Sequence, residues 1–135
     1  MIGLDGSYFG KNCISELKHY YHSGFSWMTV GSIEYVPHHH ELNDLHRTYH
    51  ILNVPIYNYT RVIYECTVNW SFNFMSGDAS CEGQTYIKTL GYLYLKKRNN
   101  THPLYRCASI INNDHYMLPS PCTMRKEKFE GLYGY

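Results

Sequence analysis

The chain has 135 residues, which suits a single domain long enough to bury a sizeable core. Its formal net charge is +1, and the compact basic cluster Lys96-Lys97-Arg98 is typical of a solvated strand end, so nucleic-acid binding is not favoured. No apolar stretch reaches the roughly 20 residues that span a bilayer, and the first residues have neither the basic start nor the apolar run of a signal peptide.

Tyrosine is the most unusual feature of the composition. The chain holds 15 tyrosines against 5 phenylalanines and 2 tryptophans, while charged residues make up 17%. A tyrosine ring packs well at a half-buried strand position, where its hydroxyl reaches water or a polar partner. The composition therefore predicts an all-β fold in one domain covering 1–135.

The first segment with a clear pattern is rich in histidine. A short helix is predicted from about Glu41 to Tyr49. If it extends to His50, His46 and His50 share one of its faces because they are four residues apart. With His40, these imidazoles are weak candidates for a zinc or copper site. Their spacing matches no strong metal motif, so a solvated segment is the favoured interpretation and no cofactor is predicted.

Two later segments, 62–68 and 86–95, are rich in β-branched and aromatic residues and predict strands. Three N-x-S/T sequons begin at Asn58, Asn69 and Asn99, where chance alone gives about one. This excess favours an exported glycoprotein.

An internal repeat is the strongest signal in the sequence. The pattern Y-x-C-x14-C-x10-Y-x-Y recurs without a gap after 41 residues, which places Tyr64 on Tyr105, Cys66 on Cys107, Cys81 on Cys122, Tyr92 on Tyr133 and Tyr94 on Tyr135. A weaker upstream copy aligns through Tyr21 and Tyr49. All three copies share an aromatic–methionine pair: Trp27-Met28, Phe74-Met75 and Tyr116-Met117.

These offsets predict three degenerate repeats of 41 to 43 residues, at approximately 14–53, 54–98 and 99–135. One such unit cannot bury its own apolar face, so the three are expected to share a core in a pseudo-threefold domain such as a β-trefoil. A competing register aligns 55–57 with 103–105 at an offset of 48 and places an insertion inside the middle copy.

The cysteines recur at equal spacing in two of the copies. This predicts one local disulfide in each, Cys66–Cys81 and Cys107–Cys122, with small buried thiols as the alternative. Disulfides are typical of secreted proteins. Cys13 is left over and is expected to be a free thiol or to bridge a homodimer.

The last copy resembles a known family through Pro103-Leu104-Tyr105-Arg106, Asp114-His115-Tyr116, Glu130-Gly131 and Tyr135. The family is a secreted tandem repeat with the pattern P-L-Y-R … D-H-F-Y … E-G … G-Y, catalogued as a domain of unknown function. The middle copy has Asn73-Phe74 in place of the Asp-His pair. The resemblance implies a β-rich, lectin-like or adhesive module and assigns no reaction.

The most reactive side chains lie in that last copy. A carboxylate beside an imidazole can orient a base or hydrogen-bond to sugar hydroxyls, while a neighbouring ring stacks on a sugar face. The alternative is a turn aspartate, an exposed histidine and a core tyrosine. The predicted ligand-binding residues are Asp114, His115, Tyr116, Tyr105, Arg106 and Trp27.

The sequence as a whole predicts a secreted, disulfide-stapled glycoprotein that binds rather than catalyses, with a glycan or glycoprotein as its first choice of ligand. The first alternative is an immunomodulatory or interaction glycoprotein whose ligand is another protein. A small histidine-dependent or metal-dependent hydrolase comes third, because no nucleophile or metal motif accompanies the histidines.

Overall fold

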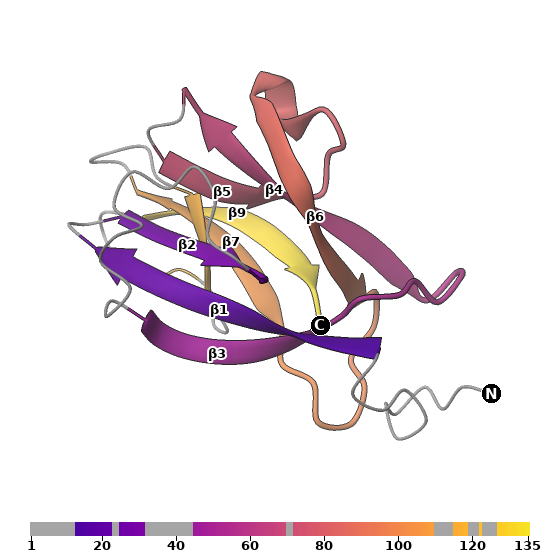
Figure 1. The fold of residues 1–135 in the computed structure, drawn as a ribbon. Helices are drawn as coiled ribbons and strands as arrows, with labels where there is room; N and C mark the ends of the chain where they lie inside the picture. The colour runs from indigo at the N-terminus through magenta and orange to yellow at the C-terminus, as the bar shows by residue number, and fades with distance from the viewer. Residues whose placement is uncertain are drawn as a thin grey trace.

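The computed structural model describes residues 13–22, 25–31, 45–69, 72–109, 115–118, 122 and 127–135. Within these residues the protein is all-β, with nine strands and one 3₁₀ turn, η3 (Figure 1). In the same part of the chain no helix is long and apolar enough to cross a membrane. The elements are β1 (Ile14–His22), β2 (Phe25–Thr29), β3 (Leu45–Leu52), β4 (Thr60–Val68), β5 (Phe72–Ser76), η3 (Cys81–Gly83), β6 (Thr85–Tyr94), β7 (Leu104–Ser109), β8 (His115–Leu118) and β9 (Glu127–Gly134).

The strands divide into three units with the same internal order. β1 pairs with β2 and β3, β4 with β5 and β6, and β7 with β8 and β9, always antiparallel. Leu52 of β3 and Tyr92 of β6 join the first two units into a six-stranded sheet, β2-β1-β3-β6-β4-β5, while the third forms the sheet β8-β7-β9. Each predicted repeat range holds one unit, but this division into two sheets does not confirm a β-trefoil.

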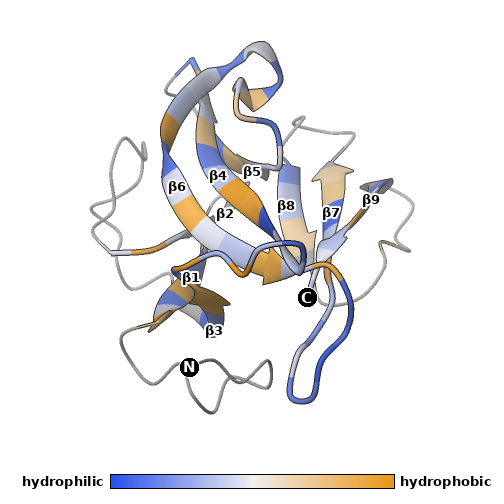
Figure 2. Cartoon of the chain, turned by 90° about the vertical axis from the view of Figure 1, so that its right-hand side faces the viewer, coloured by the Kyte–Doolittle hydropathy of each residue, from blue (hydrophilic) through white to orange (hydrophobic). Residues whose placement is uncertain are grey.

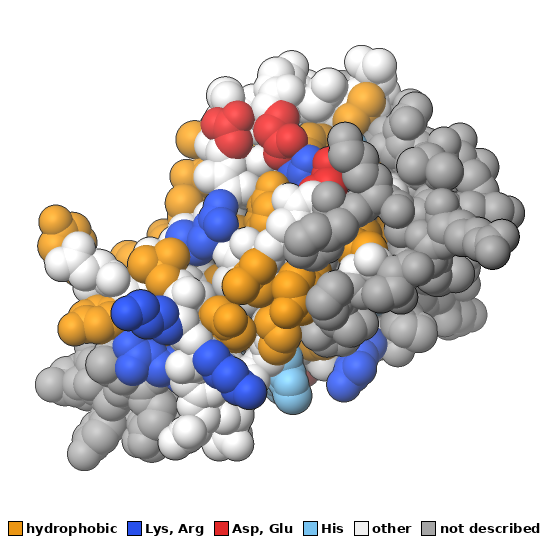
Figure 3. All heavy atoms as spheres, turned by 180° about the vertical axis from the view of Figure 1, so that it is seen from behind, with side chains coloured by type: hydrophobic (Ala, Val, Ile, Leu, Met, Phe, Trp, Pro, Cys, Tyr) orange, Lys and Arg blue, Asp and Glu red, His pale blue; other side chains and the backbone are white. Residues whose placement is uncertain are grey.

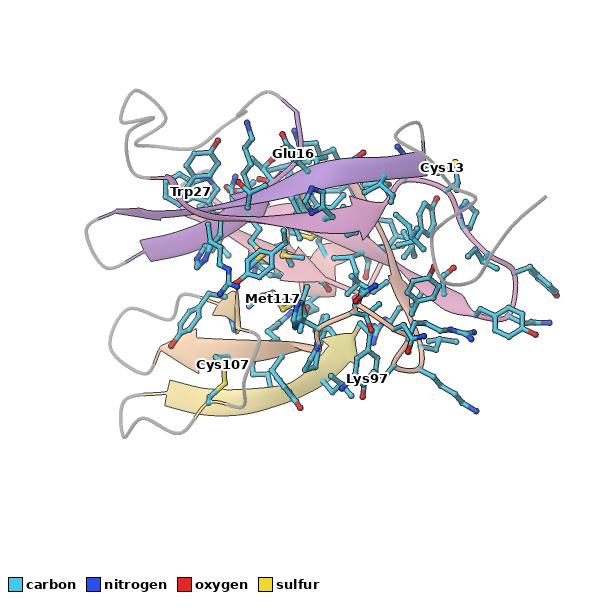
Figure 4. All side chains as sticks on the ribbon, turned by 90° about the horizontal axis from the view of Figure 1, so that it is seen from below. Cys13, Glu16, Trp27, Lys97, Cys107 and Met117 are labelled. Atoms are coloured by element: carbon cyan, nitrogen blue, oxygen red, sulfur yellow. A yellow bond between two sulfur atoms is a disulfide. The ribbon has the colours of Figure 1, made fainter. Side chains whose placement is uncertain are left out.

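Main-chain hydrogen bonds also tie the third unit to the second. Tyr94 N donates to Tyr135 O at 2.8 Å, and Tyr135 N donates to Tyr94 O at 2.9 Å. The short strands β2, β5 and β8 contact one another. Figures 1 and 4 show β1 and β3 in one layer and β7 and β9 in the opposite one, and Figure 4 shows side chains between the two layers.

A register shift occurs at a matching place in every unit. The pairing of the first strand with the third shifts after His19, after Glu65 and after Arg106. All three residues are buried, and each pairs on its other side with the methionine of the unit's second strand. His19, Glu65 and Arg106 are therefore corresponding positions of the three units.

The pairing corrects the gap-free alignment of the last two units. Gly91 of β6 lies opposite Ile63, and Gly134 of β9 lies opposite Leu104. These glycines are 43 residues apart. The residues of β9 therefore correspond to those of β6 at an offset of 43, not at the offset of 41 that the gap-free alignment predicts. Both have a positive φ, 157° and 154°, and a Cβ on Gly91 would collide with the carbonyl oxygen of Leu52. This position therefore requires glycine.

One hydrophobic cluster receives side chains from all three units. The methionines of the aromatic–methionine pairs, Met28, Met75 and Met117, are at most 3% exposed and pack together in it. Figure 4 shows Met117 between the two layers, and Figure 2 shows apolar and polar residues mixed along β4 and β6. The other buried members are Leu17, Ile51, Ile63, Leu90, Leu93 and Leu104.

The predicted helix from Glu41 to Tyr49 is wrong in the part that the structure describes, because Leu45–Leu52 is strand β3. Tyr49 and Ile51 pack on the core cluster, while Arg47 and His50 are exposed. Antiparallel pairing with β1 supplies main-chain hydrogen bonds, and this tertiary pairing overrides the local pattern. Residues 41–44 lie outside the described residues.

Both predicted disulfides are confirmed. Cys66 pairs with Cys81 and Cys107 with Cys122, with Cα atoms 5.8 and 6.0 Å apart, within the usual range for a disulfide. Each bridge links the first strand of its unit to the segment that follows the second strand. Cys13 is free and partly buried.

Candidate functional site

Arg106, one of the predicted ligand-binding residues, is 3% exposed and lies at the centre of a polar network. Its two Nη atoms donate to Glu82 of η3 at 2.6 and 2.8 Å. Its Nε donates to Glu130 of β9 at 2.8 Å, and Nη1 also donates to Met75 O at 2.9 Å. The guanidinium lies over the rings of Phe74 and Tyr133. Arg106 therefore joins the second unit to the third.

The carboxylates around Arg106 are held in their charged form. The hydrogen bond from Arg106 keeps the pKa of Glu82 below its usual value. Burial acts to raise the pKa of Glu130, but hydrogen bonds from Arg106 and His115 outweigh it, and the result is a lowered pKa. Burial raises the pKa of the Tyr133 hydroxyl, which lies 3.0 Å from Arg106 Nη1. The network is an ion-pair cluster at neutral pH.

Among the other predicted ligand residues of the third unit, His115 joins the Arg106 network and Tyr105 lies on the opposite face of β7. His115 Nδ1 lies 2.6 Å from Glu130 Oε1, so that imidazole belongs to the same network. Tyr105 precedes Arg106 in β7 and therefore lies on the opposite face of the strand. Tyr116 is partly buried in β8, and Asp114 lies outside the described residues.

Trp27 is placed away from solvent. It is 5% exposed in β2, and its ring stacks on that of Tyr20 with centroids 5.5 Å apart. Tyr20 pairs with Trp27 across β1 and β2, as Cys66 pairs with Phe74 in the second unit. Tyr20 therefore occupies the position at which the second unit has the disulfide-bonded Cys66.

Of the three histidines named as weak metal candidates, only His50 has a side chain that the structure describes. His50 is exposed on β3, His46 is described only in its main chain, and His40 lies outside the described residues. No group of three His, Cys, Asp or Glu residues able to hold a metal ion occurs in the part of the chain that the structure describes.

The three sequon asparagines, Asn58, Asn69 and Asn99, are all exposed. Asn58 and Asn69 have positive φ, 68° and 51°, which asparagine tolerates better than most residues and which is typical of tight turns. Oligosaccharide attachment requires an accessible asparagine, and each of the three meets that requirement.

A groove between β3, β6 and the turn after β6 was not predicted from the sequence. It has a volume of about 440 Å³, within the range of small-molecule sites. We call it the β3–β6 groove. It is lined by Ile14, Arg47, Thr48, Tyr49, His50, Ile51, Leu52, Tyr92, Leu93, Tyr94, Arg98, Asn99, Asn100, Thr101, His102, Leu104 and Tyr135.

Two arginines give the β3–β6 groove its charge. Arg47 lies over the ring of Tyr49 at 5.1 Å, and Arg98 lies over the rings of Tyr59 and Tyr94 at 5.4 and 5.6 Å. The lining residues include no aspartate and no glutamate. Figure 3 shows apolar side chains gathered in the middle of one face of the molecule, with Lys and Arg side chains beside them and acidic ones at the opposite edge.

A tight turn positions Arg98. Arg98 N donates to Thr101 Oγ1 at 2.9 Å, and Thr101 Oγ1 donates to Arg98 O at 2.6 Å. Asn100 has a positive φ of 61°, which asparagine tolerates better than most residues. The signal for this site in the sequence was the basic cluster followed by a polar turn, interpreted above as a solvated strand end.

Comparison with models of known protein families, with curated protein sequences and with solved structures found no match to this chain. The function is therefore inferred from the residues and their geometry.

Proposed function

We propose that the protein is a secreted glycoprotein that acts as a binding module, with a glycan or the glycan of a glycoprotein bound in the β3–β6 groove. The observation that carries the proposal is the lining of this groove by tyrosine rings, arginines and short polar side chains.

The chemistry of the groove suits a sugar ring. Tyr49, Tyr92 and Tyr135 are partly buried, so each ring is held in place while part of it remains accessible. Aromatic faces pack on the apolar side of a sugar, and short polar groups fix its hydroxyls. Asn100 on the turn after β6 is exposed and supplies such a group.

Two further observations support an extracellular location. Disulfides persist in oxidising compartments, and the protein has two of them. The sequon asparagines are also exposed, as glycosylation requires.

Binding is favoured over catalysis by the way the acid–base side chains are used. Glu82, Glu130 and His115 are hydrogen-bonded within the Arg106 network. Side chains committed to holding two units together are poorly suited to proton transfer, which needs a group free to reach the substrate.

The test is a glycan array probed with protein produced without N-linked glycans, because a glycan on Asn99 would occupy the rim of the groove. His50→Ala and His102→Ala remove exposed lining side chains at little cost to the fold, and the exposed Lys97→Ala outside the groove is the matched control. Weaker binding by the two histidine variants supports the groove as the site. Absence of binding to any glycan contradicts the proposed function.

The same array distinguishes the groove from the third unit. Tyr116→Ala changes a partly buried ring of β8 that does not line the groove. If Tyr116→Ala loses binding per folded molecule while His50→Ala does not, the glycan binds at the third unit.

A protein ligand is the second candidate. Tyr57 is 88% exposed, Tyr59 47% and Leu95 49%, and Leu95 N donates to Tyr59 O, so two of these apolar groups are neighbours. Exposed aromatic side chains are enriched at protein interfaces. Retention of a partner by the protein after enzymatic removal of the partner's glycans would favour this candidate.

A further inference from the structure

We infer that the β3–β6 groove prefers acidic saccharides, which carry a carboxylate or sulfate group, over neutral ones. The inference rests on the proposed function and adds the chemical class of its ligand. Its basis is a lining that contains Arg47 and Arg98 but neither aspartate nor glutamate.

Arg98 is prepared to bind an anion. The rings of Tyr59 and Tyr94 pack against its guanidinium. Its Nε is buried and has no hydrogen-bond partner among the described residues. A buried donor without a partner is unfavourable, and an oxygen of an anionic sugar entering the groove would satisfy it.

Comparison with Arg106 makes the difference clear. The donors of Arg106 are taken by two carboxylates and a main-chain carbonyl, and the side chain is sequestered from solvent. Arg98 lines an open groove and has no carboxylate partner in the described part of the chain. Guanidinium groups bind carboxylates and sulfates through paired hydrogen bonds.

Arg47 provides the second positive charge from a different wall. It lies on β3 and is exposed, with its guanidinium over Tyr49, while Arg98 belongs to the turn after β6. Two elements far apart in the sequence therefore each contribute one cation to the lining of the same groove.

The experiment measures the affinity of protein produced without N-linked glycans for sialyllactose, sulfolactose and lactose by titration calorimetry. We expect either acidic sugar to bind at least about tenfold more tightly than lactose, as charge-assisted hydrogen bonds allow. The two acidic probes separate a carboxylate ligand from a sulfate ligand.

Arg47→Gln and Arg98→Gln should each reduce the affinity for the acidic sugars about tenfold. Lys96→Gln and Lys97→Gln are matched controls, because they remove the same charge from exposed neighbours of Arg98 that do not line the groove. These two variants should change the affinity for the acidic sugars less than about twofold. Because Arg98 packs on two rings, the denaturation midpoint of each variant is compared with that of the parent protein. If Arg98→Gln is unfolded, Arg47→Gln, at an exposed position, provides the test.

Each outcome has one meaning. If the glycan array is blank, the proposed function fails and this inference with it. If the array shows binding but lactose binds as tightly as the acidic sugars, the inference is wrong and the proposed function stands. If acidic sugars are preferred but Arg47→Gln and Arg98→Gln bind like the parent, the preference arises elsewhere and the groove is not its source.

Discussion

Arg106 and Glu82 are joined by two hydrogen bonds, Nη1 to Oε2 at 2.6 Å and Nη2 to Oε1 at 2.8 Å. Glu65, at the position of the second unit that corresponds to Arg106, makes a similar link to the first unit, since Thr29 Oγ1 donates to Glu65 Oε1 at 2.7 Å. Buried polar side chains at corresponding positions therefore hold neighbouring units together.

Replacing Arg106 should destabilise the protein strongly. Arg106→Met removes the shared partner of Glu82 and Glu130, and we expect a loss of about 3 kcal/mol in the free energy of unfolding. The value lies at the low end for a broken buried pair because the two carboxylates keep side-chain exposures of 40% and 20%. Urea denaturation measures it.

The matched control for Arg106 is Arg61→Met. Arg61 also lies over the ring of Tyr133, at 4.9 Å, but it is only partly buried. We expect Arg61→Met to lower the free energy of unfolding by less than about 1 kcal/mol. Equal losses for the two variants would show that ring contact, rather than the paired carboxylates, stabilises the site.

Stability should fall in acid. The pKa values of Glu82 and Glu130 are lowered in the folded protein, so the unfolded chain binds more protons as the pH decreases. Their contribution is present above the ordinary glutamate pKa of about 4.3 and is lost as the pH falls through the lower folded values. Denaturation midpoints measured from neutral pH downward should show this loss.

Glu82→Gln should flatten the acid limb of that profile, whereas Glu16→Gln, at an exposed position of β1, should leave it unchanged. Asp78, whose pKa is lowered by hydrogen bonds from Ser80, adds to the same limb in the parent and in both variants. A profile for Glu82→Gln as steep as that of the parent would contradict the role of this ion pair.

The two disulfides should differ in their resistance to reduction. Cys66 and Cys81 are both 0% exposed, whereas Cys122 is partly exposed. A thiolate reductant must reach a sulfur atom, so Cys107–Cys122 should open first. Alkylation followed by mass spectrometry over a time course gives the order. Simultaneous opening of both bridges would indicate that reduction requires global unfolding.

Removing either bridge should lower the free energy of unfolding by roughly 2 to 5 kcal/mol. The paired variants Cys66→Ala with Cys81→Ala, and Cys107→Ala with Cys122→Ala, test each one. A change below this range for one pair would mean that its unit is held by packing and main-chain pairing instead.

A homodimer, if one forms, should be bridged by Cys13. Cys13 is the free cysteine, it is partly buried against the cluster of Leu52 and Tyr94, and its carbonyl oxygen accepts from Asn53 N. Under oxidising conditions we expect a covalent dimer on non-reducing gels that disappears in Cys13→Ser. Persistence of the dimer in that variant would assign it to another contact.

The amino-acid sequence by itself determined features that depend on neighbouring residues. The predicted strands 62–68 and 86–95 overlap β4 and β6 because β-branched and aromatic residues fit the pleated, half-buried surface of a sheet. The disulfides were predictable because the same cysteine separation of 15 residues recurs in two units.

Tertiary structure decided what depends on distant residues. Leu45–Leu52 is a strand because β1 is available to pair with it, although the segment by itself suggested a helix. Arg106 became an internal link because Glu82 and Glu130, each 24 residues away in sequence, meet it in space. The β3–β6 groove is formed by a strand of the first unit, the turn after β6 and Tyr135. These parts are far apart in the sequence, so no local pattern predicts the groove.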